Sequence, residues 1–135
     1  MSTKIFPDKD AAFPNPRIPS LCYIKNVVKN PRIIVGDYTY YDDIDGADRF
    51  ESRVTHFYDF IGDRLIIGNF CAIARGVTFI MNGANHRMDC ATTYPFYIMG
   101  GKWGGAIAPV MHELPLKGDT VIGNDVWIGQ NVTIM

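Results

Sequence analysis

The feature of this 135-residue chain that most restricts its fold is an apolar residue at every sixth position in two separate blocks. The first block carries Ile61, Ile67, Ile73 and Phe79, and the second carries Ile122, Ile128 and Ile134. Neither an α-helix, with 3.6 residues per turn, nor a half-buried strand, with a repeat of two, produces this interval. Short strands separated by regular corners do, and three such strands per turn stack into a triangular parallel β-helix.

The positions around these apolar residues are also restricted. Most of them are followed directly by a small residue, namely Gly62, Gly68, Ala74, Gly123 or Gly129. Four residues after the anchors comes a second position expected to face inward, occupied by Leu65, Cys71, Val77, Gly83, Val126 and Val132. An earlier hexad at residues 35–40 (VGDYTY) fits the same template. We therefore expect one all-β domain over residues 1–135.

Three segments interrupt the repeat. Residues 1–30 are rich in proline and predict an extended N-terminal arm with one short helix before Asn30. Residues 42–59 are acidic and predict a solvated loop or short helix with a polar surface. Residues 85–120 form a long excursion loop, and loops of that length are usually functional or disordered. Its larger side chains either wall a pocket or pack the loop against a prism: Tyr94, Phe96, Tyr97, Met99, Trp103, Met111 and Leu114.

The composition of the chain limits the classes of partner that we expect it to bind. Hydrophobic residues make up 47% of the chain and charged residues 20%, which is typical of globular proteins. The formal net charge of −1 leaves neither a basic stripe for nucleic acid nor a basic patch for membranes, so we expect a small-molecule partner. We expect no secretory signal and no membrane span. The three cysteines form no CxxC pair, which favours the reducing cytoplasm and argues against a zinc site.

One histidine stands where chemistry is expected. His86 follows the last hexad of the first block, at the start of the excursion loop, where an imidazole anchored on a rigid coil can act as a general base. A solvated loop histidine is the alternative. His56 and His112 lack that placement, and we expect each of them either to lie on the surface or to pack against other side chains. No serine-hydrolase elbow, P-loop or dinucleotide fingerprint is present.

Several longer motifs carry a resemblance to a known family. Residues 79–89 (FIMNGANHRMD), 93–96 (TYPF) and 114–129 (LPLKGDTVIGNDVWIG) resemble the xenobiotic acetyltransferases, above all those that acetylate streptogramin A antibiotics. The tyrosine-rich residues 36–42 are similar to the same group. The resemblance implies a left-handed parallel β-helix, a homotrimer with active sites between subunits, and acetyl-CoA as cosubstrate. We expect no metal. It assigns His86 as the base that deprotonates an antibiotic hydroxyl.

The same resemblance suggests further site residues. Tyr40 and Asp42 match residues that line the acceptor site, with Met111 and Leu114 as further members, and Trp127 matches a tryptophan beside the CoA arm. Packing at a trimer contact or on the prism face is the alternative role for Tyr40 and Trp127. We also expect the C-terminal coils and cap of the family to be absent. Two other functions therefore stay open: an inactive trimeric ligand-binding scaffold, and a sugar or serine O-acetyltransferase.

Overall fold

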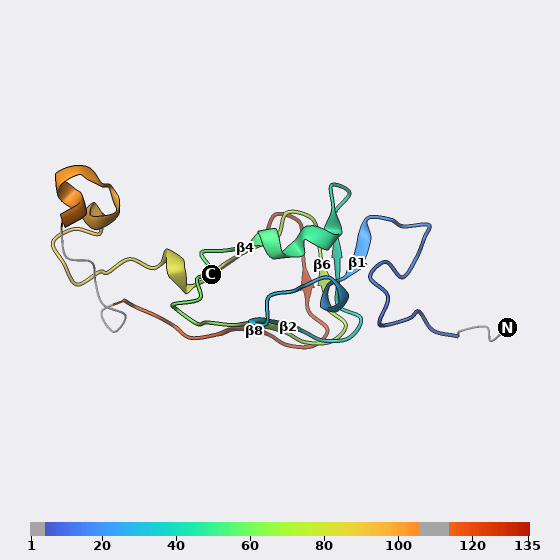
Figure 1. The fold of residues 1–135 in the computed structure, drawn as a ribbon. Helices are drawn as coiled ribbons and strands as arrows, with labels where there is room; N and C mark the ends of the chain where they lie inside the picture. The colour runs from blue at the N-terminus through green and yellow to red at the C-terminus, as the bar shows by residue number, and fades with distance from the viewer. Residues whose placement is uncertain (1–4, 106–113) are drawn as a thin grey trace.

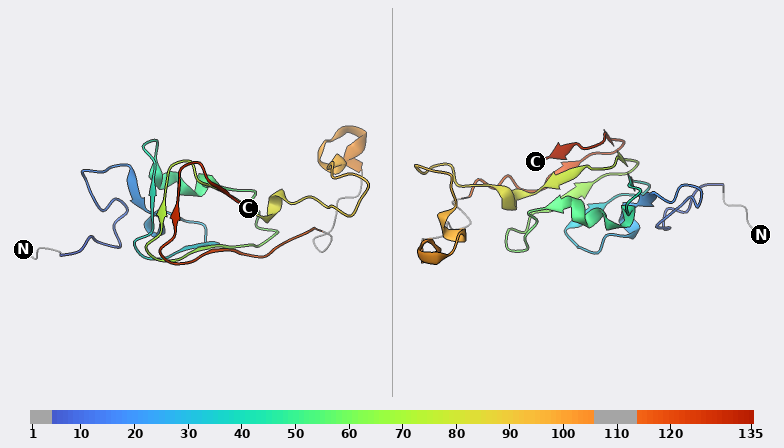
Figure 2. Two further views of the ribbon diagram at one scale, coloured as in Figure 1. Left: turned by 180° about the vertical axis from the view of Figure 1, so that it is seen from behind. Right: turned by 90° about the horizontal axis from the view of Figure 1, so that it is seen from above.

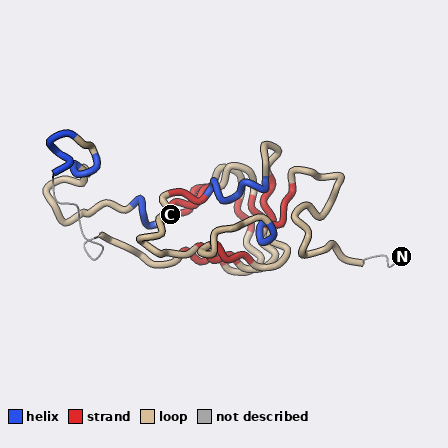
Figure 3. The backbone as a smooth tube through the Cα atoms, viewed as in Figure 1, coloured by secondary structure: helices blue, strands red, loops and turns tan. Residues whose placement is uncertain are grey.

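Three β-sheets form the sides of the central body in the computed structural model, which describes residues 5–105 and 114–135. The first sheet contains β2 (Ile33–Val35), β5 (Leu65–Ile67) and β8 (Thr120–Ile122). The second contains β3 (Tyr40–Asp42), β6 (Ala72–Ile73) and β9 (Trp127–Ile128), with β1 (Leu21–Tyr23) antiparallel to β3. The third contains β4 (Val54–Thr55), β7 (Thr78–Ile80) and β10 (Thr133–Ile134). Figure 3 shows these short strands stacked and joined by loops.

Successive strands visit the three sheets in rotation, so that β2–β4, β5–β7 and β8–β10 form three coils. Apart from the β1–β3 pair, the pairings between the ten described strands are all parallel. Among the described residues the helical segments are short 3-10 turns: η1 (Ile24–Asn26), η2 (Ala47–Arg53), η3 (Asn82–Ala84), η4 (Phe96–Ile98) and η5 (Gly101–Gly105). The expectation of a strand-rich chain with parallel sheets is confirmed, and the arrangement is that of a three-sided coil.

The interval of six carries the chain from one sheet to the next, as from Ile67 in β5 to Ile73 in β6, and strand pairing places equivalent residues of successive coils in register. In the first sheet Val35, Ile67 and Ile122 are in register; in the second, Tyr41, Ile73 and Ile128; in the third, Val54, Phe79 and Ile134. Most of these side chains are buried in one apolar core. The hexad interval predicts that Ile61 begins the series, and this is wrong: Ile61 lies in a hydrogen-bonded turn between β4 and β5 rather than in a strand.

At one corner of the coil, contacts between neighbouring coils explain why a glycine stands directly before a polar residue. The Asn69 side-chain oxygen accepts a hydrogen bond from the backbone N–H of Asp37 (2.7 Å), one coil earlier. Asn124 does the same for the N–H of Asn69 (2.8 Å). A Cβ atom on Gly36 would lie 2.2 Å from the Asn69 oxygen, and one on Gly68 would lie 2.4 Å from the Asn124 oxygen. Only glycine leaves room for this ladder.

The sequence predicts a polar surface for the acidic segment after β3, and this prediction is wrong for one face of the segment. Phe50, in η2, is completely buried beside Ala47. Its ring lies 5.4 Å from that of Tyr41 and 6.0 Å from that of Phe79, both in edge-to-face geometry. The segment therefore supplies core packing for the first two coils, because an aromatic ring buries a large apolar area.

The N-terminal arm and the excursion leave the coils at opposite ends of the molecule (Figures 1 and 2). The arm pairs through β1, and the short helix expected before Asn30 is η1. Two arm residues, Cys22 and Ile24, are fully buried. The excursion departs after β7, carries η4 and η5 away from the prism, and returns to β8. Since β8 pairs in register with β5, the insertion does not disturb the stacking of the coils.

Two glycines in equivalent hexad positions provide a matched test of the corner. Gly68→Ala forces a Cβ to within 2.8 Å of the Asn124 and Gly123 backbone atoms, whereas a Cβ on Gly123 meets nothing within 4 Å. We expect Gly68→Ala to lower the free energy of unfolding by about 1–3 kcal/mol, the usual cost of overpacking. Gly123→Ala should leave it unchanged or slightly raised. Urea unfolding monitored by circular dichroism measures both; equal effects would contradict the ladder.

Candidate active site

His86 stands on the outgoing stem of the excursion, two residues after η3. Its Nδ1 atom lies 2.8 Å from the carbonyl oxygen of Thr93, across the first turn of the loop. A carbonyl oxygen only accepts, so Nδ1 carries the proton and the other ring nitrogen, Nε2, keeps a free lone pair in the neutral ring. The ring itself is exposed. This is the arrangement that a general base requires: one nitrogen oriented, the other open to a substrate proton.

A hollow of about 460 Å³ opens beside this ring. Its walls are mostly aromatic and aliphatic, with two imidazoles among them: His56, Tyr58, Phe60, Ile61, Gly83, Asn85, His86, Pro95, Tyr97, Ile98 and Leu114. Apolar walls with few polar groups are typical of sites for small organic ligands. The hollow draws on both stems of the excursion and on the turn after β4.

The turn after β4 reaches His86 because β4 and β7 pair in register, with Thr55 beside Ile80. The chains that follow both strands therefore emerge at the same edge. Gly83 takes no inward corner position, contrary to the hexad prediction. It lies in η3, where its N–H donates to the His56 carbonyl (3.1 Å) and a Cβ would lie 2.4 Å from the Tyr58 ring.

Sequence reasoning missed His56 as a neighbour of this hollow. Its backbone has a φ of 53°, the left-handed region, and its Nδ1 lies 3.2 Å from the Thr55 hydroxyl. The ring packs edge-to-face against Tyr58. The signal that would have found it is the β4–β7 pairing, which no hexad in residues 42–59 reveals. His56 thus lines the same hollow as His86 instead of a separate part of the surface.

The excursion residues divide into two groups. Leu114 and Tyr97 line the hollow beside His86. Tyr94, Phe96 and Trp103 instead pack on one another, with ring centroids 4.6 Å apart for Tyr94–Phe96 and 5.2 Å for Phe96–Trp103. Met111 and His112 lie outside the described residues.

Three other predicted site residues lie on a different side of the prism. Tyr41 points into the core, so its neighbours Tyr40 and Asp42 point outward from β3. Trp127 stands in the same row as Tyr40, separated by Ala72, and its side chain is 82% exposed. Within one chain the structure does not bring these residues to the hollow of His86.

A second, apolar hollow surrounds Tyr40. Leu21, Tyr23, Tyr38 and Phe70 line it together with the start of the described arm. Tyr38 and Phe70 occupy equivalent corners in neighbouring coils, and their rings stack with centroids 5.1 Å apart. The outer surface of the second sheet thus offers aromatic rings, whereas the edge at His86 offers the imidazoles.

Sequence comparisons add to this geometry. The chain is 64% identical over 94 residues, 70% of its length, to a probable macrolide acetyltransferase of Lysinibacillus sphaericus, covering 52% of that protein. It is 51% identical over 112 residues, 83% of its length, to virginiamycin A acetyltransferase of Staphylococcus aureus, covering 50% of that protein. It is 42% identical over 111 residues, 80% of its length, to a chloramphenicol acetyltransferase of Morganella morganii, covering 52% of that protein.

The chain is homologous to the xenobiotic acetyltransferases. The resemblance of the motifs around His86 and Trp127 is thereby confirmed at the level of the family. This acetyltransferase homologue spans about half the length of the curated relatives it matches. No protein-family model matches it.

Residues 5–105 and 114–135 contain no group of three or more His, Cys, Asp or Glu side chains placed to hold a metal ion. The same residues include no helix that is long and apolar enough to cross a membrane.

The hydrogen bond to Thr93 predicts a measurable state of His86. At a pH where the imidazole is neutral, its Nδ1 should carry the proton, as read from ¹⁵N chemical shifts in a long-range ¹H–¹⁵N NMR spectrum. His86→Gln assigns the signal by its disappearance. A neutral ring found mainly with the proton on Nε2 would contradict this geometry.

Proposed function

We propose that this chain provides the base and the acceptor pocket of an acetyl-CoA-dependent O-acetyltransferase that modifies a streptogramin A-type antibiotic. The observation that carries the proposal is the imidazole of His86, with Nδ1 engaged by Thr93 and Nε2 free, at an apolar hollow. Its relatives are named as acetyltransferases of virginiamycin A, macrolides and chloramphenicol. The apolar walls favour a large hydrophobic acceptor over a sugar or serine.

The reaction follows from the chemistry of a hydroxyl, which is a weak nucleophile until a base removes its proton. Nε2 of His86 takes that proton while the hydroxyl oxygen attacks the acetyl carbonyl of acetyl-CoA. The carbon–sulfur bond then breaks, and the proton held on His86 passes to the departing thiolate. The acetyl ester and free CoA leave. No covalent enzyme intermediate and no metal take part in this scheme.

Acetyl-CoA needs a surface for its long arm. Trp127 on β9 exposes most of its ring, and Val121 on β8 is also exposed, so the third coil presents apolar surface to solvent. An indole packs well against an aliphatic chain while its N–H stays available. We assign Trp127 to the CoA side of the site. Tyr40 and Asp42, in the same sheet, belong to the acceptor side.

We further propose a left-handed coil assembled as a homotrimer. Tyr40, Asp42 and Trp127 lie on the outer surface of the second sheet, while His86 and Leu114 lie at the edge beyond β7. Residues so separated within one chain contribute to a common site only if two chains meet. A cyclic trimer brings one face of each subunit against a different face of the next. The unpaired cysteines among the described residues, Cys22, Cys71 and Cys90, fit a cytoplasmic enzyme.

The role of His86 is tested by substitution. His86→Asn should reduce acceptor-dependent release of CoA thiol by about 100-fold or more, because a positioned base contributes 10² to 10⁴. His56→Asn is the matched control, since His56 lines the same hollow but its Nδ1 faces the Thr55 hydroxyl; its effect should stay within about tenfold.

Thiol release from acetyl-CoA in the presence of streptogramin A, measured with a colorimetric thiol reagent, provides the readout. Release that is equal in His86→Asn and the parent would reject the role of the base. Thermal stabilisation of the parent by the antibiotic without any thiol release would instead favour the alternative, a scaffold that binds without turnover.

The shared site is tested by mixing subunits. His86→Asn and Tyr40→Ala chains, each with little activity alone, are denatured together in equal amounts and refolded. If each site takes His86 from one subunit and Tyr40 from the next, about a quarter of the sites regain both residues by random assembly. Activity no higher than that of either variant alone would show that the two residues do not meet across subunits.

A further inference from the structure

A buried carboxylate outside the hollow fixes the stems of the excursion. Asp63 lies in the turn before β5, and its side chain is 3% exposed. Its Oδ2 atom accepts two hydrogen bonds from one residue, Asn82: from the backbone N–H (2.9 Å) and from the side-chain Nδ2 (2.8 Å). Hydrogen bonds to a charged oxygen are about twice as strong as those between neutral groups. A carboxylate at this depth therefore holds Asn82 firmly.

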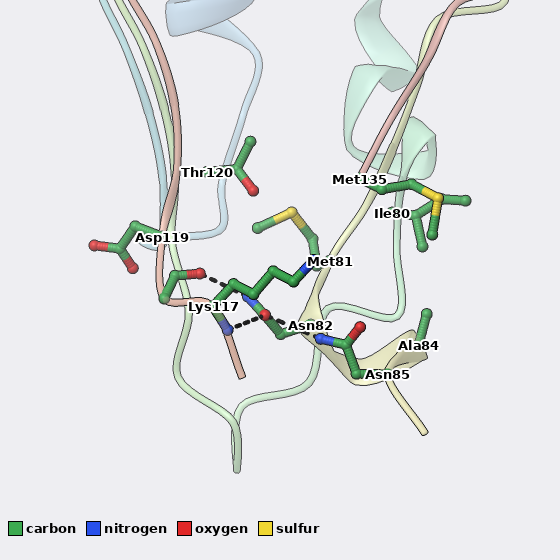
Figure 4. A pocket seen from close by; sticks show the side chains of 10 residues that line it. Ile80, Met81, Asn82, Ala84, Asn85, Lys117, Asp119, Thr120 and Met135 are labelled. Atoms are coloured by element: carbon green, nitrogen blue, oxygen red, sulfur yellow. Dashed lines mark hydrogen bonds between the residues drawn. The ribbon is translucent and has the colours of Figure 1, made fainter. Parts of the chain in front are cut away.

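Asn82 in turn uses every polar atom of its side chain (Figure 4). Its Nδ2 also donates to the Gly118 carbonyl (2.6 Å). Its Oδ1 accepts from the Lys117 backbone N–H (2.8 Å) and from the Asn85 side chain (3.2 Å). Gly118 and Lys117 belong to the returning stem, and Asn85 to the outgoing one. A single amide thus joins the turn before β5 to both stems.

The negative charge of Asp63 faces one cation, the guanidinium of Arg32. Its Oδ1 atom accepts no hydrogen bond from any residue that the structure describes, and it lies 3.6 Å from Nη1 of Arg32. That guanidinium is itself held by the Asp63 and Phe57 carbonyls, by the Asp59 carboxylate, and over the Phe57 ring at 3.8 Å. A buried charge is costly unless it is paired and hydrogen-bonded. Asp63 is therefore retained by Arg32 on one oxygen and by Asn82 on the other.

These bonds lie close to both walls of the hollow. His86 follows Asn85 directly, and the Asn85 side chain also donates to the Pro115 carbonyl (3.1 Å), next to Leu114. The stems are thus joined at the point where the outgoing one delivers the imidazole and the returning one delivers an apolar wall. The bond from His86 to Thr93 then only has to orient the ring.

We propose that Asp63, acting through Asn82, is a positioning residue for His86, and we name this pair the Asp63–Asn82 clamp. The proposal deepens the proposed function and rests on His86 being the base. The clamp fixes the separation of the two stems, and this sets where the free Nε2 atom stands relative to the hollow.

The experiment uses the whole chain with Asn82→Asp and Asp63→Asn. The first replaces a donor with an acceptor facing Asp63 and Gly118, while the second removes the charge and keeps the shape. Asp59→Asn is the matched control, because Asp59 also pairs with Arg32 but its side chain is 98% exposed and it does not touch Asn82. Amide hydrogen exchange and the His86 tautomer, read by ¹⁵N NMR, are measured for each.

We expect amide exchange at residues 82 and 117 to rise about tenfold or more in Asn82→Asp, as for the loss of a buried hydrogen bond, and less in Asp63→Asn. The His86 tautomer should shift from Nδ1–H alone to a mixture in both, with β5 and β7 still protected. Asp59→Asn should change neither measurement. Unchanged exchange, or faster exchange with an unchanged tautomer, would overturn the positioning role.

If Asn82→Asp fails to fold, as shown by lost protection in β5 and β7, Asn82→Ser replaces it under the same criteria. In an active parent the clamp variants should also lower kcat while the KM for acetyl-CoA stays within about twofold. Failure of the two proposals is distinguishable. A parent without acetyl transfer rejects the proposed function, whereas exchange and tautomer still decide the clamp.

Discussion

The parallel register between coils is the constraint on which the other features depend. At one corner it is set by a ladder in which Asn69 caps the amide of Asp37 and Asn124 caps that of Asn69. A second pair repeats the pattern inside the corner. The Thr39 hydroxyl donates to the Gly68 carbonyl, and the Cys71 thiol donates to the Gly123 carbonyl. Because these contacts recur at the same hexad position, each coil is aligned on the one before it, and the apolar residues meet in one core.

Because the coils are aligned in this way, a long segment can leave the prism and return without disturbing the strand pairing between coils. Where the excursion returns, Arg64 donates from its guanidinium and from its backbone N–H to Asp119 at 2.8–3.0 Å, and these bonds hold the pKa of that carboxyl below its usual range. Thr120 then pairs beside Leu65 in register. The scaffold is repetitive, whereas His86, the proposed base, lies on the inserted loop, and binding and catalytic residues are often found on loops.

The sequence predicted the repeating parts well and the single contacts poorly. Hexads around Ile67, Ile73 and Ile128 are visible because each strand repeats the same local pattern. Ile61 shares the interval but not the fold, since an interval alone does not distinguish a strand from the turn before one. The sequence did not predict the burial of Phe50, because a single buried ring in an acidic segment produces no periodic pattern.

The surroundings of His86 show the same limit. The sequence motif around His86 identified that residue as a candidate. His56 is brought near it only by the pairing of β4 with β7, and Asp63 is linked to it only through Asn82. Such contacts join residues distant in sequence, and no local pattern encodes them. Likewise, the motifs of Tyr40 and Trp127 do not reveal that both residues lie in one row of the second sheet, outside the hollow of His86 in the same chain.

In the proposed reaction the free nitrogen of His86 meets the hydroxyl that is to be acetylated. The most direct measurement is a crystal structure of the protein with a streptogramin A antibiotic bound. We expect the reactive hydroxyl oxygen to lie within roughly 2.6–3.2 Å of Nε2, the reach of a general base, with Nδ1 still bonded to Thr93. An antibiotic bound away from this hollow, or with its hydroxyl groups turned from the imidazole, would contradict it.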